Sequence, residues 1–393
     1  MKIFDKCKRF VIARDIMNAG VYPFFREISS DIDTNVIING KKTIMFGSNS
    51  YLALTNHPKV KEASINAIKK YGTGCAGSRF LNGTLDIHVE LEDRLARLVK
   101  KKAALLFSTG YQTNLGVIAC LLGPKDYCVM DKLNHSSLVA GAMLSHCKML
   151  RYNHNDIQDA SRIIEKNQIN NGILITSDGV FSMDGDCANL EELVKLKEKH
   201  NAALLIDEAH GIGVFGEYGE GLVVERNLSD KVDLIMGTFS KSLASIGGFI
   251  AADEDIIHYL KHNSRAFIFS ASMPPSSVAS VLAALDIMKS EPERRHKLWD
   301  NTKYMHNGLK TLGFKTSGGE TPILPIIVGE DMTAFKMCME LQEQGIFVNP
   351  AVSPAVLPGC ALIRLSLMSS HTYQEIDYTL DKLKIVGKKY KLI

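Results

Sequence analysis

The residues with the clearest chemical meaning are a lysine, an aspartate and a histidine that follow strand-like segments. Lys241 lies in the small and apolar sequence 236–249, and Asp207 and His210 come at the end of the apolar run 202–206. An amine in apolar surroundings, a carboxylate and an imidazole are the groups that a pyridoxal phosphate (PLP) enzyme requires. Such a lysine forms the Schiff base, and the aspartate pairs with the pyridinium nitrogen so that the ring accepts electrons. A lysine alone is usually a solvated surface charge, so the prediction depends on this whole group.

Residues that suit a phosphate group occur near a second strand-like segment. The stretch 108–114 (STGYQTN) follows the apolar run 103–107 and opens a helical pattern, while Thr238 and Ser240 precede the lysine. A strand–glycine–helix junction presents backbone N–H groups at a helix N-terminus, and these bind phosphate. On this stretch alone, a phosphate site and an ordinary helix N-cap are equally well supported.

Two further polar residues stand at positions where chemistry is expected. His135 follows the apolar run 127–130, at a strand end where α/β sheets build their sites, although a loop histidine is more often structural. Arg364 interrupts the apolar run 361–367. A buried arginine needs an anionic partner. That partner could equally be a carboxylate of the protein or the carboxylate of a substrate.

The pattern of apolar runs and helical segments predicts an α/β protein with a mostly parallel sheet. Short uninterrupted apolar runs alternate with helical patterns up to about residue 285, which is typical of parallel strands buried on both faces. After that point the sequence pattern predicts a smaller α+β domain, with strands near 322–328 and 361–367. We therefore expect an N-terminal arm at 1–48, a large domain at 49–285 and a small C-terminal domain at 286–393.

Composition is that of an ordinary folded protein. The 393 residues are 46% hydrophobic and 23% charged with a formal net charge of +3, which argues against disorder and against bulk attraction to nucleic acid. Eight cysteines without a CxxC pair indicate free thiols in a reducing compartment, so a cytoplasmic location is expected. The start of the chain carries charges throughout and lacks the apolar core of a signal peptide. Basic residues cluster at both ends, and solvated termini are favoured over membrane contact.

Several motifs that suggest other chemistry lack the context it needs. The GxGxxG string at 72–77 follows a helical pattern, and the one at 211–216 continues as a loop, so a dinucleotide site is not expected. The segment 237–242 resembles the end of a P-loop but has serine in place of its glycine. No HExxH or Cys/His pair has ligand spacing, so no metal is expected.

Five motifs together resemble those of the α-oxoamine synthase family. They are GTGCAGSRFLNGT (72–84), FSTGYQTN (107–114), DGVFSMDGD (178–186), IDEAHGIGVFG (206–216) and GTFSKSLASIGGF (237–249), in the family's order. These PLP enzymes condense an amino acid with an acyl-CoA and release carbon dioxide. The resemblance implies the aspartate aminotransferase-like fold type I of PLP-dependent transferases.

The resemblance also implies a role for individual residues. Lys241 corresponds to the Schiff-base lysine, Asp207 to the partner of the ring nitrogen, and His210 to the partner of the ring hydroxyl. His135 corresponds to the histidine that stacks on the ring and touches the substrate carboxylate. The further implied cofactor contacts are Gly110, Tyr111, Ser182, Thr238, Ser240, and Ser270 and Ala271 toward the other subunit; the further implied substrate contacts are Asn49 and Arg364.

Substrates and partners follow from the resemblance in the same way. The stretches 262–272 and 241–249 are most similar to the branch of the family that joins L-serine to a long-chain acyl-CoA. Sibling branches join glycine to acetyl- or succinyl-CoA, or alanine to pimeloyl-CoA. A homodimer with a shared active site is implied, and a lipid product implies peripheral contact with the inner membrane. A catalytically silent subunit and a nicotinamide oxidoreductase are the alternatives from other classes.

Overall fold

The structure is a computed structural model that describes residues 2–317 and 321–393. The chain divides into two compact units, which are described separately. Sequence analysis placed a boundary after residue 285 and set the first 48 residues apart as an arm. In the structure the division falls within helix α13 (Glu293–Leu312). Unit 1 comprises Met1–Ser48, Met183–Gly185 and Leu298–Ile393, and unit 2 comprises Asn49–Ser182 and Asp186–Lys297.

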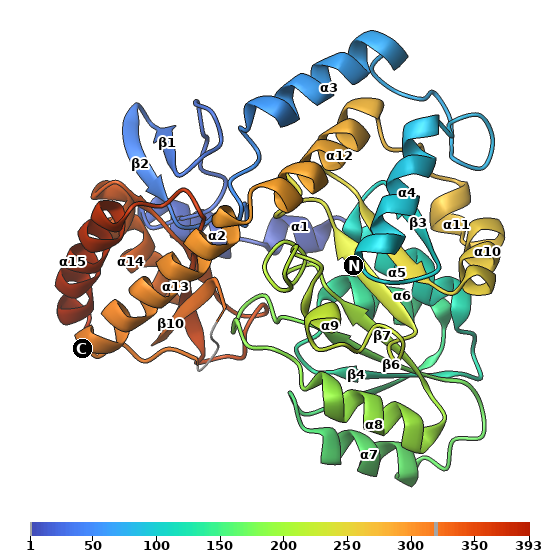
Figure 1. The fold of residues 1–393 in the computed structure, drawn as a ribbon. Coiled ribbons are helices and arrows are strands. Elements are labelled where there is room, and N and C mark those ends of the chain that lie inside the picture. The colour runs from blue at the N-terminus through green and yellow to red at the C-terminus, as the bar shows by residue number, and fades with distance from the viewer. Residues whose placement is uncertain (1, 318–320) are drawn as a thin grey trace. The chain divides into compact units, whose positions relative to one another are not determined.

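Unit 2 is built on a seven-stranded sheet in the order β3-β9-β8-β7-β6-β4-β5. Strands β3, β4, β6 and β7 of this sheet are labelled in Figure 1. Strand β9 is antiparallel to both of its neighbours, and the other strands run in one direction. The predicted α/β class with a mostly parallel sheet is therefore confirmed. The strands are β3 (Ala103–Phe107), β4 (Tyr127–Asp131), β5 (Lys148–Tyr152), β6 (Ile173–Asp178), β7 (Ala203–Asp207), β8 (Leu234–Thr238) and β9 (Gly248–Ala252).

The central strands form because their side chains are apolar on both faces. Every residue of β4 and β6 is buried, which is what helices on both faces of a parallel sheet produce. On one face, Leu105, Met130 and Leu234 pack in a single core cluster with Val117 and Leu138 from the covering helices. Burial of each such side chain contributes about 1.5–3 kcal/mol.

The helices of unit 2 begin at identifiable caps. The Thr109 side chain accepts a hydrogen bond from the Gln112 N–H, and His135 accepts one from the Ser137 N–H, so both residues act as N-caps. Helix α5 packs on α6, and α12 packs on α3. The helices are α3 (Pro58–Tyr71), α4 (Asp86–Leu98), α5 (Gly110–Leu121), α6 (Ser136–Ser145), α7 (Ile157–Lys166), α8 (Leu190–His200), α9 (Leu222–Glu225), α10 (Glu254–Asn263), α11 (Arg265–Ile268) and α12 (Pro275–Ser290).

Unit 1 contains two three-stranded sheets with helices. Their strand orders are β1-β2-β11 and β10-β13-β12, and the long pair β10/β13 is antiparallel. No helix in the described part of the chain is long and apolar enough to cross a membrane. The elements are α1 (Asp5–Arg9), α2 (Ile12–Asn18), β1 (Asn35–Ile38), β2 (Lys41–Met45), β10 (Ile323–Gly329), α14 (Asp331–Glu343), β11 (Ile346–Phe347), β12 (Asn349–Ala351), β13 (Ala361–Ser366) and α15 (Tyr373–Lys389).

Candidate active site

Three neighbouring strands of unit 2 end in polar residues at the same edge of the sheet. Strands β6, β7 and β8 end at Asp178, Asp207 and Thr238. The register pairs Asp178 with Asp207, and Asp207 with Met236. Because the strands are parallel, their carboxyl ends form the crevice in which α/β sheets bind ligands. Burial and the charge of Asp207 raise the pKa of Asp178 well above its usual range.

Asp207 has the surroundings that a ring-nitrogen partner needs. Its carboxylate is 3% exposed and accepts hydrogen bonds from Asn114 Nδ2 at 2.7 Å and from the Ala209 N–H at 2.9 Å. A buried carboxylate that is oriented by neutral donors is completed by a cationic N–H such as that of a pyridinium. The residue therefore fits a PLP ring.

His135 is held at the start of α6 by hydrogen bonds to Asp178 and Ser137. Its backbone N–H donates to Asp178 Oδ2 at 2.9 Å, and its Nδ1 lies 2.7 Å from Ser137 Oγ. Burial lowers the pKa of this imidazole, the positive charge of Lys241 lowers it further, and the charge of Asp207 partly opposes both. Asn114 Nδ2 donates to Ser137 Oγ at 2.9 Å and to Asp207 Oδ2 at 2.7 Å, so the hydrogen bonds of His135 and Asp207 meet at one amide. An imidazole held this way can stack on an aromatic ring.

The residues predicted to bind phosphate come together at the start of α5. A Cβ atom added at Gly110 would lie 2.6 Å from Thr238 Oγ1, so the absence of a side chain lets the helix end approach β8. Thr238 Oγ1 lies 3.1 Å from Ser240 Oγ. The Thr109 side chain accepts a hydrogen bond from the Gln112 N–H. The N–H groups of Gly110 and Tyr111, in the first turn, have no intrahelical acceptor. This cradle of N–H groups and hydroxyls fits a phosphate.

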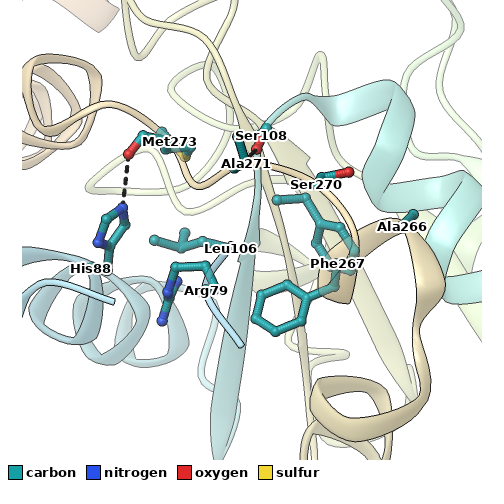
Figure 2. A pocket seen from close by; sticks show the side chains of 10 residues that line it. Arg79, His88, Leu106, Ser108, Ala266, Phe267, Ser270, Ala271 and Met273 are labelled. Carbon is teal, nitrogen blue, oxygen red and sulfur yellow. Dashed lines mark hydrogen bonds between the residues drawn. The ribbon is translucent and has the colours of Figure 1, made fainter. Parts of the chain in front are cut away.

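Ser270 and Ala271 lie beside the same helix end in their own chain. Gln112 Nε2 donates to Ser270 Oγ at 3.2 Å, and Ser108 Oγ donates to the Ala271 carbonyl. Figure 2 shows Ser108 and Ala271 together at the top centre and the His88–Met273 hydrogen bond to their left; all four residues line a small pocket. Contact of this pair with the phosphate of another subunit stays a prediction.

The remaining predicted residues have distinct settings. Lys241 is half-buried in a bend that follows β8, and Ser182 lies in the turn after β6. His210 follows β7 in a turn, with its Nδ1 2.7 Å from the Tyr51 hydroxyl. The Asn49 Oδ1 is buried, and no group in the described residues hydrogen-bonds to it, so it can accept one from a ligand.

Arg364 belongs to unit 1, where it lies on β13. Its side chain is buried, with the residue 5% exposed, and it donates to Ser366 Oγ at 2.6 Å. A carboxylate partner from a substrate is compatible with the fork of donors on a guanidinium. The role of Arg364 toward a substrate remains a prediction.

Sequence reasoning missed two residues that hold the site together. Asn114, which donates to Asp207, is the last residue of the quoted motif 107–114, so its position carried a signal. Tyr51, which contacts His210, lies two residues after Asn49, and only the folded chain reveals the contact. Both act on residues whose own roles were predicted.

We expect Gly110→Ala to weaken PLP binding by about 10- to 100-fold, because the new methyl group would push α5 away from Thr238 and displace the phosphate donors. Gly123→Ala is the matched control, since its Cβ would meet nothing closer than Asp126 Oδ2 at 3.7 Å. Equilibrium dialysis of PLP against both apo-proteins measures the effect. If the two variants bound PLP with equal affinity, the start of α5 would not be the phosphate site.

A charged histidine connects the end of β4 with the loop after β6 on which Ser182 lies. His154 follows β5, and its Nδ1 lies 3.1 Å from Asp131 Oδ1 while its Nε2 lies 2.8 Å from Asp186 Oδ2. Burial lowers the pKa of His154, but the hydrogen bonds and charges of the two carboxylates outweigh it and raise the pKa from 6.5 to about 10. The imidazolium thus bridges the segments after β4 and β6.

The stability that His154 contributes should depend on pH. Its pKa is higher in the folded chain than in the unfolded chain, so the contribution is complete below pH 6.5 and is lost as the pH rises through about 10. We therefore expect His154→Gln to lower the free energy of unfolding most at low pH, and the gap to close toward alkaline pH. Urea denaturation of both proteins across this range checks the trend, and a gap that stays constant would contradict it.

Comparisons with known proteins agree with this geometry. The model of the class I and II aminotransferase family matches residues 41–383. A serine palmitoyltransferase (SPT) of Sphingobacterium spiritivorum is 51% identical over 391 residues, covering 100% of this chain and 98% of the relative. An 8-amino-7-oxononanoate synthase of Thermoanaerobacter pseudethanolicus is 39% identical over 380 residues, with 96% of each chain covered. A solved structure of SPT with its PLP internal aldimine superposes with a TM-score of 0.96 at 33% identity over 100% of both chains.

Proposed function

The chain belongs to the class I and II aminotransferase family, and we propose that it acts as a serine palmitoyltransferase. The predicted fold type I, the α-oxoamine synthase relationship and a PLP-dependent acyltransferase activity are confirmed by the family and its relatives. The proposed reaction joins L-serine to palmitoyl-CoA and gives 3-oxosphinganine, CoA and carbon dioxide, the first step of sphingolipid synthesis. The observation that carries the proposal is the meeting of buried Asp207, His135 and the Gly110–Thr238 cradle at one sheet edge.

PLP is the cofactor, and the residues of unit 2 suit its parts. The α5 N-terminus with Thr238 and Ser240 would hold its phosphate, Asp207 its ring nitrogen, and His210 its ring hydroxyl. Lys241 would hold it covalently. When bound, PLP supplies an electron sink that stabilises negative charge at the α-carbon of an amino acid.

The side chains then divide the work on the substrate. We propose that Arg364, Asn49 and His135 hold the serine carboxylate, which fixes the bond at the α-carbon that breaks. The Lys241 amine takes the α-proton as a general base. Asp207 keeps a proton on the ring nitrogen through its negative charge, so electrons can move away from the α-carbon. The α-carbon then forms a bond to the acyl carbon, and CoA leaves as its thiol with the proton that Lys241 took up. The carboxylate leaves as carbon dioxide, and a proton from solvent returns to the α-carbon.

The nearest alternative is the chemistry of a sibling enzyme, glycine C-acetyltransferase or 8-amino-7-oxononanoate synthase. The second of these is the function of a 39% identical relative. A panel of serine, glycine and alanine against acetyl-, pimeloyl- and palmitoyl-CoA separates the candidates. We expect the highest kcat/KM with serine and palmitoyl-CoA. A higher value for alanine with pimeloyl-CoA or glycine with acetyl-CoA would reject serine palmitoyltransferase activity.

A second copy of the chain is the partner that we propose. The residues Ser270 and Ala271 lie next to the Gly110 cradle, where they could also reach the phosphate of a neighbouring subunit. Sedimentation of the active enzyme at assay concentration should give the mass of two chains. Full activity in a species with the mass of one chain would contradict a shared active site.

We further propose that the N-terminal segment touches an anionic inner-membrane surface. Helices α1 and α2 have no buried residue, and Phe4 and Phe10 are 72% and 62% exposed beside the basic Lys6, Lys8 and Arg9. Apolar rings next to cationic side chains bind the boundary of anionic bilayers. Co-flotation with phosphatidylglycerol vesicles, lost on replacement of the three basic residues by glutamate, is expected. Equal flotation of both proteins would contradict it.

A further inference from the structure

A buried tyrosine contacts the histidine that faces the ring hydroxyl of the proposed cofactor. Tyr51 is 1% exposed, and its hydroxyl lies 2.7 Å from Nδ1 of His210, which is 6% exposed. The two rings meet edge to face, with centroids 6.1 Å apart and planes inclined by 60°. A short hydrogen bond between buried groups is stronger than its counterpart in water. Which of the two groups donates depends on which nitrogen of His210 carries the proton.

The Tyr51 hydroxyl determines what the other nitrogen of His210 can do. A neutral imidazole carries one proton, so a donor at Nδ1 leaves the proton on Nε2, and an acceptor at Nδ1 leaves Nε2 bare. Only a protonated Nε2 can donate to an anionic ring oxygen. An unprotonated Nε2 would place its lone pair against a lone pair of the ring oxygen, and the two would repel.

We propose that Tyr51 is a positioning residue that donates its hydroxyl proton to Nδ1 of His210 and so fixes Nε2–H as the donor to the ring oxygen of PLP. This inference rests on the proposed function, because it takes the ring oxygen of PLP as the acceptor for His210 Nε2–H. It adds a residue that the family motifs around Lys241 and Asp207 do not contain.

The local structure holds the Tyr51 hydroxyl in place. The Tyr51 N–H donates to the Asn49 carbonyl at 2.8 Å, and Leu52 and Leu54 are fully buried on the same turn. The turn is therefore fixed by packing as well as by hydrogen bonds. The same turn presents the buried Asn49 amide, which is a proposed substrate contact. A shift of this turn would change the ring contact and the substrate contact together.

The first test is spectroscopic and uses the PLP-loaded enzyme. Tyr51→Phe removes the hydroxyl and keeps the ring, so PLP should still bind. Without a fixed donor at the ring oxygen, that oxygen holds a proton more tightly, and the pH midpoint of the cofactor's absorbance change should rise by about one unit. We expect kcat to fall roughly 10-fold, as for other orienting partners of an active-site histidine, with little change in the KM for serine.

Tyr152→Phe is the matched control. Tyr152 is also 1% exposed, and it lies on β5, which is three strands away from β7 in the sheet. This variant should leave the pH midpoint and kcat at their original values even if it lowers stability. A Tyr51→Phe enzyme with an unchanged midpoint, or a midpoint that both variants shift equally, would overturn the inference.

The second test uses the protein without cofactor and is independent of activity. Nitrogen-15 NMR of the imidazoles, with His210→Gln for assignment, reports which nitrogen carries the proton. We expect the Nε2–H tautomer of His210 in the original chain and a mixture of tautomers in Tyr51→Phe. An Nδ1–H tautomer in the original chain would overturn the inference. Failure of PLP to bind at all would instead reject the proposed function, and the NMR result would still decide the tautomer.

Discussion

Replacing Lys241 by alanine should abolish covalent cofactor binding and lower turnover by at least about 10⁴-fold, because one amine serves as both the covalent anchor and the α-carbon base. Borohydride should add a stable phosphopyridoxyl group to the peptide that contains Lys241 in the original chain and to no peptide of the variant. Mass spectrometry of the reduced protein measures this directly. PLP can still occupy the cradle of Gly110 and Thr238 without a covalent bond.

Lys101→Ala is the control for the loss of a lysine that is partly buried. The Lys101 ammonium donates to the Val232 carbonyl, and burial lowers its pKa, so the variant should be less stable yet keep PLP and turnover. Normal turnover in Lys241→Ala would contradict the whole scheme. A chain that binds no PLP would instead agree with a catalytically silent subunit, and a nicotinamide spectrum would agree with an oxidoreductase.

Replacing Asp207 by asparagine should be the second most damaging change. The amide has the size of the carboxylate. Its oxygen can still accept from the Ala209 N–H, and its NH2 can donate to the buried Asn114 Oδ1 once that amide turns over, so the site should keep its shape. It removes the negative charge that keeps a proton on the ring nitrogen. We expect kcat to fall by about 10³-fold while PLP stays covalently bound, because the variant lacks the negative charge that stabilises the charge developing in the transition state.

Asp126→Asn is the matched control for this change of charge. Asp126 also accepts two backbone N–H bonds, from Gly123 at 2.9 Å and Gly172 at 3.2 Å, but it lies at the opposite ends of the strands. Its variant should lose stability and keep kcat. Steady-state kinetics with saturating substrates compares the two enzymes, and an Asp207→Asn enzyme as active as Asp126→Asn would show that the charge is not needed.

The sheet could be predicted from the sequence wherever both faces of a strand are buried. The apolar run 172–177 predicts a strand, and β6 occupies Ile173–Asp178. Strand β5 was missed because it lies at the sheet edge, and four of its five residues, Lys148–Arg151, are at least partly exposed, so its sequence is polar. The reversed direction of β9 could not be read either, because an apolar strand looks the same in both directions.

The individual residues of the candidate site could be predicted from the sequence, but the contacts between them could not. Lys241, Asp207 and His210 stand at strand ends, which local pattern reveals. Their supporting contacts join distant parts of the chain: Asn114 is 93 residues from Asp207, and Tyr51 is 159 residues from His210. Periodicity carries no information on such separations. Only the sheet order and the α5 packing bring these partners together.

The most direct test of the central claim follows the carboxyl carbon of serine. The enzyme is incubated with palmitoyl-CoA and L-serine labelled at that carbon, and carbon dioxide, free CoA and the lipid product are measured together. The account predicts one labelled carbon dioxide and one CoA for each unlabelled 3-oxosphinganine, all dependent on Lys241. Release of CoA with the label retained in the product, or no reaction of serine while glycine or alanine reacts, would contradict it.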